Sequence, residues 1–335
     1  MKAGSIRNEL ESYASTVKEF ILLALDGKPK ELYQASSHYI SSGGKRLRPF
    51  MVIKSCEMFG GDLHRALPAA AAVELVHNFS LVHDDIMDND EVRHSVPTVH
   101  KYYGTPLAIL AGDILFSKAF QLIVVSGRKA KIPEKAISDI VAKIATACVS
   151  VCEGQAIDVD VASSRKLPNE SQYVGMICKK TAALFEASCA IGTLSAPQAN
   201  QVDVENLGLF GRNIGTAFQL VDDLIGVIGD PKLTGKSVGN DIREGKKTYP
   251  ILLALKNTRS DERDKILKVF GSKSSSSSDL REAVKIISDT GIDSVVRNAA
   301  REYMDRALKC IEGYDDSNAK SALQSSAKFI VERSL

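Results

Sequence analysis

Apolar residues recur at helical spacing along nearly the whole chain. From Leu67 to Val82 they form an almost continuous run, which predicts a helix that is buried on most of its sides. No stretch alternates between apolar and polar residues as a half-buried strand does. The pattern therefore predicts an all-α protein, with further helices over residues 5–24, 46–59, 105–125, 133–160, 170–190, 203–229, 240–256, 260–270, 278–290, 295–312 and 316–333.

The interruptions between these helices are short. The serine tract Ser274–Ser278 is typical of a solvated loop rather than of a domain boundary. No sequence repeat of the length found in solenoid proteins stands out. We therefore expect residues 1–335 to form a single domain.

The charges nearly balance, with 43 Lys and Arg against 41 Asp and Glu and a formal net charge of +2. No global field draws such a chain to nucleic acid or an anionic membrane, so any anion site must be built locally. The six cysteines form no CxxC pair, which favours small buried residues over metal ligands. Without a signal-peptide run or about 18 uninterrupted apolar residues, we expect a cytoplasmic protein with no membrane span.

An acidic cluster, LVHDDIMDND at residues 81–90, follows directly on the buried apolar run. On a helix Asp84 and Asp88 share one face, and Asp85 lies three residues before Asp88. Carboxylates on one face suit Mg²⁺, which takes one or two of them together with substrate phosphates. A solvated acidic helix end is the alternative, but the preceding buried run favours a metal site.

A second acidic pair, Asp222 and Asp223, interrupts the apolar segment FQLVDDLIG at residues 218–226, with Gln219 one turn earlier. Burying such a pair costs several kcal/mol unless cations compensate it. A cavity whose acidic walls hold metal ions and a polyphosphate would remove that cost.

Basic residues alternate with these acidic clusters. Lys45, Arg46 and Arg48 lie beside the Gly43-Gly44 turn, where backbone NH groups can also face an anion. Each basic group alone is usually surface charge, but together they predict a site for two diphosphates bridged by Mg²⁺. The others are Arg93, Lys179, Lys180, Lys236, Lys246 and Lys247.

In this order the motifs resemble those of the trans-isoprenyl diphosphate synthases over essentially the whole chain. GGKRLRP resembles the family's basic motif, DDIMD its first aspartate-rich motif, and KKTA contains its Lys-Thr motif. FQLVDDLIG resembles the second aspartate-rich motif, and GNDIREGKKT its lysine-bearing sequel. The resemblance implies one large helical bundle of the isoprenoid synthase type around a central cavity, and a homodimer.

The resemblance also implies a role for each matching residue. Isopentenyl diphosphate would be held by Lys45, Arg48 and His77. The allylic diphosphate would be held by Arg93, Lys180, Thr181, Gln219, Lys236 and Lys246. About three Mg²⁺ ions would be ligated by Asp84, Asp88 and Asp222, supported by Asp85 and Asp223.

The implied reaction is ionisation of the allylic diphosphate, followed by attack of the isopentenyl alkene on the carbocation. Mg²⁺ and preplaced cationic side chains stabilise the leaving diphosphate. The cation needs a dry apolar pocket, which Phe79 and Phe218 could line. The catalytic set implied in this way is Asp84, Asp85, Asp88, Arg93, Lys180, Asp222 and Lys236.

Two positions depart from the family pattern. His94-Ser95 follows Arg93 where the family usually has Arg-Gly, and the second Arg normally helps to hold isopentenyl diphosphate. Affinity for that substrate is therefore in doubt, with His94 as the replacement. Gly226 stands where many members have a third aspartate, and we expect activity to tolerate this loss.

Chain length has one cue in the sequence. Phe79 lies five residues before Asp84, about 7.5 Å deeper along the helix, and the small Ser80 lies beneath the metal face. By geometry alone Phe79 is a flank rather than a floor. An aromatic at this position is similar to archaeal-type geranylgeranyl diphosphate synthases, which implies a C20 product, with a C15 farnesyl or a longer product as the alternative.

Two other functions remain open from the residues alone. A terpene cyclase is also helical and uses DDxxD, but it needs no second diphosphate site such as GGKRLRP would provide. A non-catalytic subunit of a heteromeric synthase typically loses its aspartate motifs, and both are present here. His94 is the one feature that favours this second alternative.

Overall fold

The protein is described by a computed structural model that covers residues 3–164, 166–229, 239–272 and 274–332. The chain divides into two compact units, each built from three separate chain segments. Unit 1 comprises Met1–Cys148, Leu184–Gly211 and Ile311–Ser326, and unit 2 comprises Val149–Ala183, Arg212–Cys310 and Ala327–Leu335. The expectation of a single domain stays a prediction.

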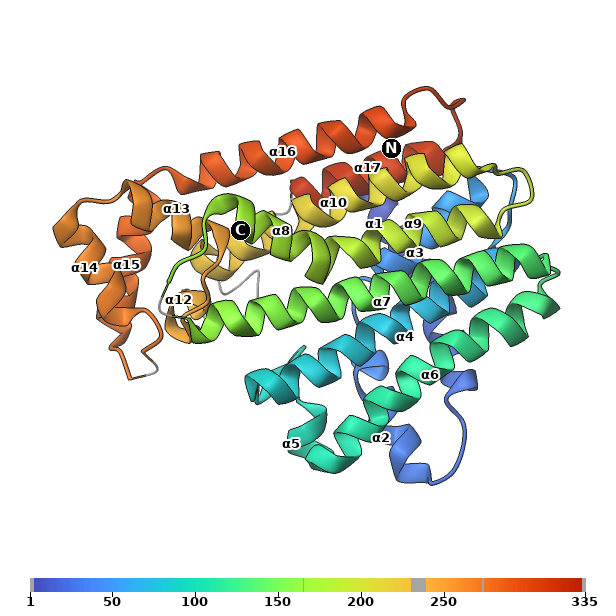
Figure 1. The fold of residues 1–335 in the computed structure, drawn as a ribbon, viewed down its shortest axis with the longest axis horizontal. Helices are drawn as coiled ribbons and strands as arrows, with labels where there is room; N and C mark the ends of the chain where they lie inside the picture. The colour runs from blue at the N-terminus through green and yellow to red at the C-terminus, as the bar shows by residue number, and fades with distance from the viewer. Residues whose placement is uncertain (1–2, 165, 230–238, 273, 333–335) are drawn as a thin grey trace. The chain divides into compact units, whose positions relative to one another are not determined.

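Unit 1 is helical apart from one short hairpin (Figure 1). Its complete elements are α1 (Ala3–Ala24), α2 (Lys30–Ser41), α3 (Leu47–Glu57), α4 (Leu63–Asp88), β1 (Val92–Arg93), β2 (Val96–Pro97), α5 (Val99–Tyr103) and α6 (Thr105–Lys129). It also contains parts of α7 (Glu134–Ser163), α9 (Ala183–Ser195), α10 (Gln201–Ile228) and α17 (Asn318–Val331).

Unit 2 contains the remaining parts of α7, α10 and α17 together with the other helices. Its further elements are α8 (Glu170–Ile177), the π-helical turn η1 (Cys178–Ala182), α12 (Asn240–Glu244), α13 (Tyr249–Asn257), α14 (Ser260–Val269), α15 (Ser277–Asp289) and α16 (Ile292–Ile311). Residues of α8, of α10 and of every helix from α12 through α16 form one apolar core. Within it α14 packs against α15 (Figure 1).

Helix α4 organises unit 1, and its burial on most sides is confirmed. It packs against α3 and runs beside α6 (Figure 1). The Asp62 side chain caps its N-terminus by accepting a hydrogen bond from the Arg65 NH at 2.9 Å. Its C-cap is Asn89, whose left-handed φ of 53° ends the helix directly after Asp88. The first acidic cluster therefore occupies the last turn of a buried helix.

The all-α class is confirmed, but three local predictions were wrong. Helices α2 and α5 were not predicted. Helix α2 shows a weak apolar period, because it buries Ser36 and Tyr39 along with Ala35 and Ile40. The helix predicted over 240–256 is two helices. Gly245 ends α12 at a φ of 73°, and α13 starts anew with a proline in its first turn.

Helices α6 and α7 are long and apolar enough to cross a membrane by length and composition alone. Only 39% of the most apolar window of α6 and 33% of that of α7 is buried inside the protein. The expectation that the chain has no membrane span therefore stays a prediction.

Candidate active site

The first acidic motif holds its three carboxylates in different environments. Asp84 is partly exposed and Asp88 is exposed, whereas Asp85 is only 1% exposed. The Tyr39 hydroxyl on α2 donates to Asp85 Oδ2 at 2.5 Å, and Arg93 on β1 donates to Asp85 Oδ1 from Nε at 2.7 Å. The carboxylate of Asp85 is therefore used inside the protein, and those of Asp84 and Asp88 reach the surface.

Arg93 is held by Asp85 and lies directly before the turn of the hairpin that follows α4. Its Nη2 lies 2.6 Å from Asp85 Oδ1 and 3.9 Å from Asp90 Oδ2. Burial acts to lower the pKa of Arg93, but the hydrogen bond and charge of Asp85 raise it above its ordinary value. The guanidinium is a fixed positive charge beside the first acidic motif.

The hairpin places His94 and Ser95 at its two-residue tip. Arg93 pairs with Val96, and both tip residues have a positive φ, 50° for His94 and 64° for Ser95. A type I′ turn requires this geometry at both positions. The left-handed backbone costs a residue other than glycine about 1–2 kcal/mol, which gives a physical reason for the glycine usual in the family at Ser95.

The basic motif has one internal side chain and two that reach the surface. Lys45 is exposed and Arg48 partly exposed, while Arg46 is buried with a left-handed φ of 47°. The Arg46 guanidinium donates to Glu74 Oε1 at 2.5 Å and to the Ile40 carbonyl at 2.8 Å. Arg46 therefore fixes the turn that carries Lys45 and Arg48, and it is not itself available to a substrate.

Arg48 and His77 are brought together, as the resemblance implies. Arg48 Nη1 lies 3.3 Å from His77 Nε2, and the guanidinium also stacks over the Phe185 ring at 4.4 Å. Burial lowers the pKa of His77 well below its ordinary value, and the positive charges of Arg48, Arg46, Arg93 and His94 lower it further. Four basic groups thus act on one neutral imidazole, and this part of unit 1 is suited to an anion.

Phe79 belongs to a row of rings between α4 and α6. Its centroid lies 4.7 Å from that of His83 and 5.1 Å from that of Phe116, which lies 5.1 Å from that of Phe120. Ser80 is partly exposed and its hydroxyl donates back to the His77 carbonyl at 2.9 Å. If Phe79 forms the apolar floor of the pocket for the growing chain, Phe116 on α6 is part of that floor.

Unit 2 holds the second acidic motif in a chain of hydrogen bonds. Thr181 Oγ1 donates to Gln219 Oε1 at 2.8 Å, and Gln219 Nε2 donates to Asp223 Oδ1 at 2.8 Å. The Tyr173 hydroxyl on α8 donates to the other oxygen, Asp223 Oδ2. Asp223 is 4% exposed, whereas Asp222 is partly exposed. Thr181, Gln219 and Asp223 are thus brought together as predicted.

Among the described residues, the hydrogen-bond donors to Asp223 are the neutral groups of Tyr173 and Gln219. Burial raises its pKa well above the ordinary value, and the nearby carboxylates of Asp241 and Asp222 raise it further. The hydrogen bonds from Tyr173 and Gln219 oppose this shift but do not cancel it. Burial and the neighbouring carboxylates thus disfavour the charged form of Asp223.

Asp241, on α12, occupies the space beside Gly226. A Cβ at Gly226 would overlap the Asp241 carboxylate. Many family members have a third aspartate at position 226. Here the carboxylate of Asp241, from another helix, lies in the space beside that position. Asp241 lies in the GNDIREGKKT motif, yet nothing in its sequence position distinguished it from the other charged residues there.

The predicted lysines of unit 2 have separate partners. Lys180 lies in the π-helical turn η1 and its Nζ is 2.6 Å from Asp158 Oδ2. Such turns occur frequently at functional sites. Lys246 is exposed and its Nζ is 2.6 Å from Glu244 Oε2. Lys236 lies outside the described residues.

Sequence reasoning missed Tyr39, Tyr173, Glu74, Phe116 and Asp241. The tyrosines carry no motif, and Tyr39 lies in a helix that the apolar pattern did not predict. Glu74 could have been recognised from the sequence, because it is a charged residue inside the otherwise apolar run of α4. A carboxylate in such a run requires a buried partner, here Arg46.

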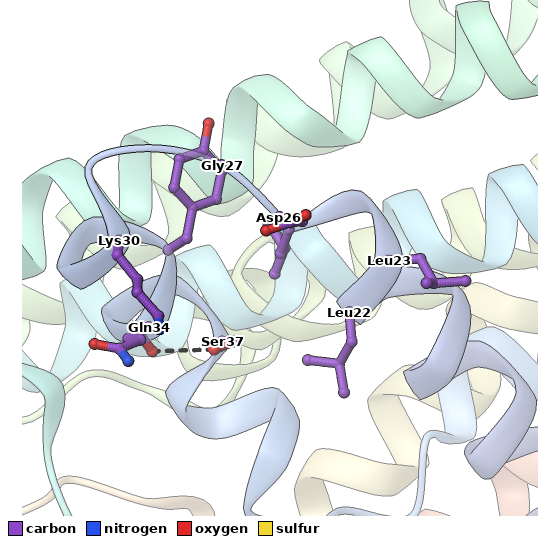
Figure 2. Close-up of a pocket in the computed structure, with 9 residues that line it drawn as sticks. Leu22, Leu23, Asp26, Gly27, Lys30, Gln34 and Ser37 are labelled. Atoms are coloured by element: carbon purple, nitrogen blue, oxygen red, sulfur yellow. Dashed lines mark hydrogen bonds between the residues drawn. The ribbon is translucent and has the colours of Figure 1, made fainter.

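A separate surface pocket of unit 1 lies between the end of α1 and α2 (Figure 2). It has a volume of about 420 Å³, and its lining includes Leu22, Asp26, Lys30 and Gln34. None of its lining residues belongs to the predicted site.

Known proteins match the chain over nearly its full length. The family model described as polyprenyl synthetase matches residues 29–287. The geranylgeranyl diphosphate synthase of Sulfolobus acidocaldarius is 41% identical over 328 residues, which cover 97% of this chain and 98% of that protein. The geranylfarnesyl diphosphate synthase of Aeropyrum pernix is 39% identical over 321 residues, covering 95% of this chain and 99% of that protein.

The fold has equally similar relatives. The crystal structure of geranylgeranyl pyrophosphate synthetase from Pyrococcus horikoshii superposes with a TM-score of 0.91 at 39% identity. The match covers 99% of this chain and 100% of the other. The similarity therefore extends over both units of the chain.

Proposed function

The chain belongs to the polyprenyl synthetase family and is a trans-prenyltransferase, and on this premise we propose that it condenses isopentenyl diphosphate head-to-tail with allylic diphosphates and releases diphosphate. The family resemblance drawn from the motifs is thereby confirmed. The observation that carries the proposed reaction is the pair of acidic motifs. Each presents a partly exposed aspartate, Asp84 or Asp222, next to a buried one.

Isopentenyl diphosphate is assigned to the basic groups of unit 1. Arg48 and His77 are in contact, and Lys45 is exposed on the turn that Arg46 fixes. A neutral His77 can donate one hydrogen bond to a diphosphate and accept another from Arg48. His94 at the hairpin tip is a further candidate contact for this anion.

The allylic diphosphate is assigned to Arg93, Lys180, Thr181, Gln219 and Lys246, and to Lys236 in the part of the chain that is not described. Cationic side chains near the leaving oxygens favour C–O cleavage because they stabilise the negative charge as it develops. Thr181 and Gln219 lie in one hydrogen-bonded chain with Asp223, so they are held in fixed orientations.

Mg²⁺ fits the donor set, with Asp84, Asp88 and Asp222 as ligands and Asp85 and Asp223 in support. Within the described residues, no group of three or more His, Cys, Asp or Glu side chains could hold a metal ion by itself. Mg²⁺ needs only one or two carboxylates when substrate phosphates complete its shell. When bound with diphosphate, about three ions would neutralise the leaving group.

For the product we propose geranylgeranyl diphosphate. Phe79 is backed by Phe116 and Phe120, which supports a closed apolar floor, and the small Ser80 leaves space above it. Relatives named geranylgeranyl and geranylfarnesyl diphosphate synthases are almost equally similar, so the proposed chain length rests on the rings around Phe79. The farnesyl product remains the alternative.

Product analysis tests the proposal. Purified protein is incubated with Mg²⁺, isopentenyl diphosphate and farnesyl diphosphate, and the dephosphorylated alcohols are separated by chromatography. Wild type should give geranylgeraniol. Phe79→Ala should extend the main product by at least one isoprene unit, because it removes the ring that faces Phe116. Unchanged chain lengths in this variant would contradict the assignment of the floor.

We also propose a homodimer in the cytoplasm, as the family resemblance implies. Sedimentation velocity on the purified protein tests the oligomeric state. A monomer at assay concentrations would contradict it.

A further inference from the structure

The two acidic motifs share an arrangement that no sequence motif records. In each, the second aspartate of the pair is buried and accepts a hydrogen bond from a tyrosine on a different helix of the same unit. Tyr39 on α2 serves Asp85 in unit 1, and Tyr173 on α8 serves Asp223 in unit 2. The arrangement therefore occurs twice, in segments far apart in the chain.

The direction of the first hydrogen bond is fixed by its surroundings. The Val99 backbone NH donates to the Tyr39 oxygen at 3.1 Å, so the tyrosine's own hydrogen points to Asp85 Oδ2 at 2.5 Å. Tyr39 is itself only 2% exposed. A buried hydroxyl with both partners satisfied leaves the Asp85 side chain one orientation.

The orientation of the buried aspartate sets that of its neighbour. Successive residues lie about 100° apart around a helix of 3.6 residues per turn. When the side chain of Asp85 is held inward, that of Asp84 is directed about 100° away from it, and Asp84 is the partly exposed member of the pair. The same relation holds for Asp223 and the partly exposed Asp222.

We propose that Tyr39 and Tyr173 are positioning residues, each of which holds the second aspartate of its pair inside the protein so that the first faces magnesium diphosphate. Tyr39 acts on Arg93 as well, because Asp85 accepts hydrogen bonds from both. In unit 2 the effect of Tyr173 extends through Asp223 to Gln219 and Thr181. Groups that orient metal ligands typically change metal affinity by about 10- to 100-fold when they are removed.

This inference rests on the proposed function, and its main readout needs no turnover. The probe is Mg²⁺ titrated in the presence of inorganic diphosphate, with the unfolding temperature of the whole chain as readout. Tyr39→Phe and Tyr173→Phe remove only the hydroxyls. Each should shift the Mg²⁺ concentration for half-maximal stabilisation upward by about 10- to 100-fold. Without ligand, each should unfold within about 2–4 °C of wild type.

Matched controls are present in both units. The Tyr13 hydroxyl donates to Glu57 Oε1 at 3.0 Å in unit 1, and that of Tyr249 lies 3.4 Å from Glu170 Oε2 in unit 2. Tyr13→Phe and Tyr249→Phe also lose a hydrogen bond to a carboxylate, but their Mg²⁺ titrations should match wild type. A general loosening of the fold would also alter the Michaelis constant for isopentenyl diphosphate. A loss of positioning alone should leave that constant unchanged in Tyr39→Phe.

The outcomes separate the two proposals. If wild type forms product and both Tyr39→Phe and Tyr173→Phe titrate like wild type, the positioning role is wrong and the proposed function stands. Equal shifts in the control variants would also overturn the positioning role. A wild-type protein that forms no product and is not stabilised by Mg²⁺ with diphosphate would overturn both.

Discussion

The two acidic motifs hold their buried aspartates in the same way, but the charges of the donors to these aspartates differ. In both, a tyrosine hydroxyl holds the buried aspartate, and a second donor holds its other oxygen. For Asp85 that second donor is the guanidinium of Arg93, and for Asp223 it is the neutral amide of Gln219. Among the described residues, the donors to Asp85 thus include a cation, whereas the donors to Asp223 are neutral.

This difference has an electrostatic consequence. The pKa of Asp223 is raised by burial and by the charges of Asp241 and Asp222, and its donors in the described part of unit 2 are both neutral. Two DD pairs that look the same in the sequence therefore differ in charge balance. Residues outside the motifs, above all Arg93 and Asp241, decide that balance.

The largest effect is expected for the first aspartate of each pair, since both are assigned to metal binding. Asp84→Ala and Asp222→Ala should each lower kcat by at least about 10³-fold, because each removes a carboxylate assigned to the ions that stabilise the leaving diphosphate. Steady-state kinetics measures this. Asp113→Ala, which removes an exposed carboxylate on α6, should leave kcat unchanged. Near wild-type turnover in Asp84→Ala would mean that the first motif is misassigned.

The charge balance predicts a difference between the buried aspartates. In metal-free protein Asp85→Asn should destabilise by about 2–3 kcal/mol, because Arg93 loses a charged hydrogen-bond partner. Asp223→Asn should cost no more than about 1 kcal/mol, since its described hydrogen-bond donors are neutral and lose no charged partner. Urea unfolding at neutral pH measures both. Equal losses in the two variants would refute the difference in compensation.

The position four residues after each first aspartate sharpens the comparison. It is Asp88 in the first motif and Gly226 in the second, where Asp241 fills the space. Gly226→Ala should destabilise by about 1–3 kcal/mol, because the Asp241 carboxylate must move. Gly175→Ala on α8 is the control, since a Cβ there meets nothing within 4 Å and a small gain is expected. Thermal unfolding of both variants decides this.

Sequence alone predicted that activity tolerates the loss of a third aspartate at Gly226, and this stays a prediction. The prediction rested on the missing carboxylate and could not include a clash with Asp241, which comes from a different helix. In general, the spacing of Asp84 and Asp88 or the order of the motifs lies within one segment and could be predicted. The contacts of Asp85 and Asp223 join helices distant in the chain and could not.

Helix prediction failed for a related reason. The long apolar period of α4 was predicted because its burial leaves nearly every position apolar. Helix α2 buries two polar side chains, so its apolar period is hidden: the Ser36 hydroxyl donates to the Leu32 carbonyl one turn earlier, and that of Tyr39 donates to the distant Asp85. The helix that supplies a positioning tyrosine was thus the one that the pattern missed.

The smallest predicted effect concerns the imidazole near the first motif. His77 has a lowered pKa in the folded protein, so below its ordinary pKa of about 6.5 only the unfolded chain binds the proton. Stability should therefore fall with decreasing pH from about 6.5, by up to about 1.4 kcal/mol per pH unit. Urea unfolding at several pH values should show a shallower fall in His77→Gln. Identical slopes would contradict the lowered pKa.

The most direct test of the proposed function counts the diphosphate released by wild-type protein for each allylic primer consumed. With Mg²⁺ and excess isopentenyl diphosphate, synthesis of geranylgeranyl diphosphate predicts three diphosphates per dimethylallyl primer, two per geranyl and one per farnesyl. Chelation of the metal should abolish all three. Release of diphosphate from the allylic substrate without consumption of isopentenyl diphosphate would contradict the prenyltransferase reaction itself.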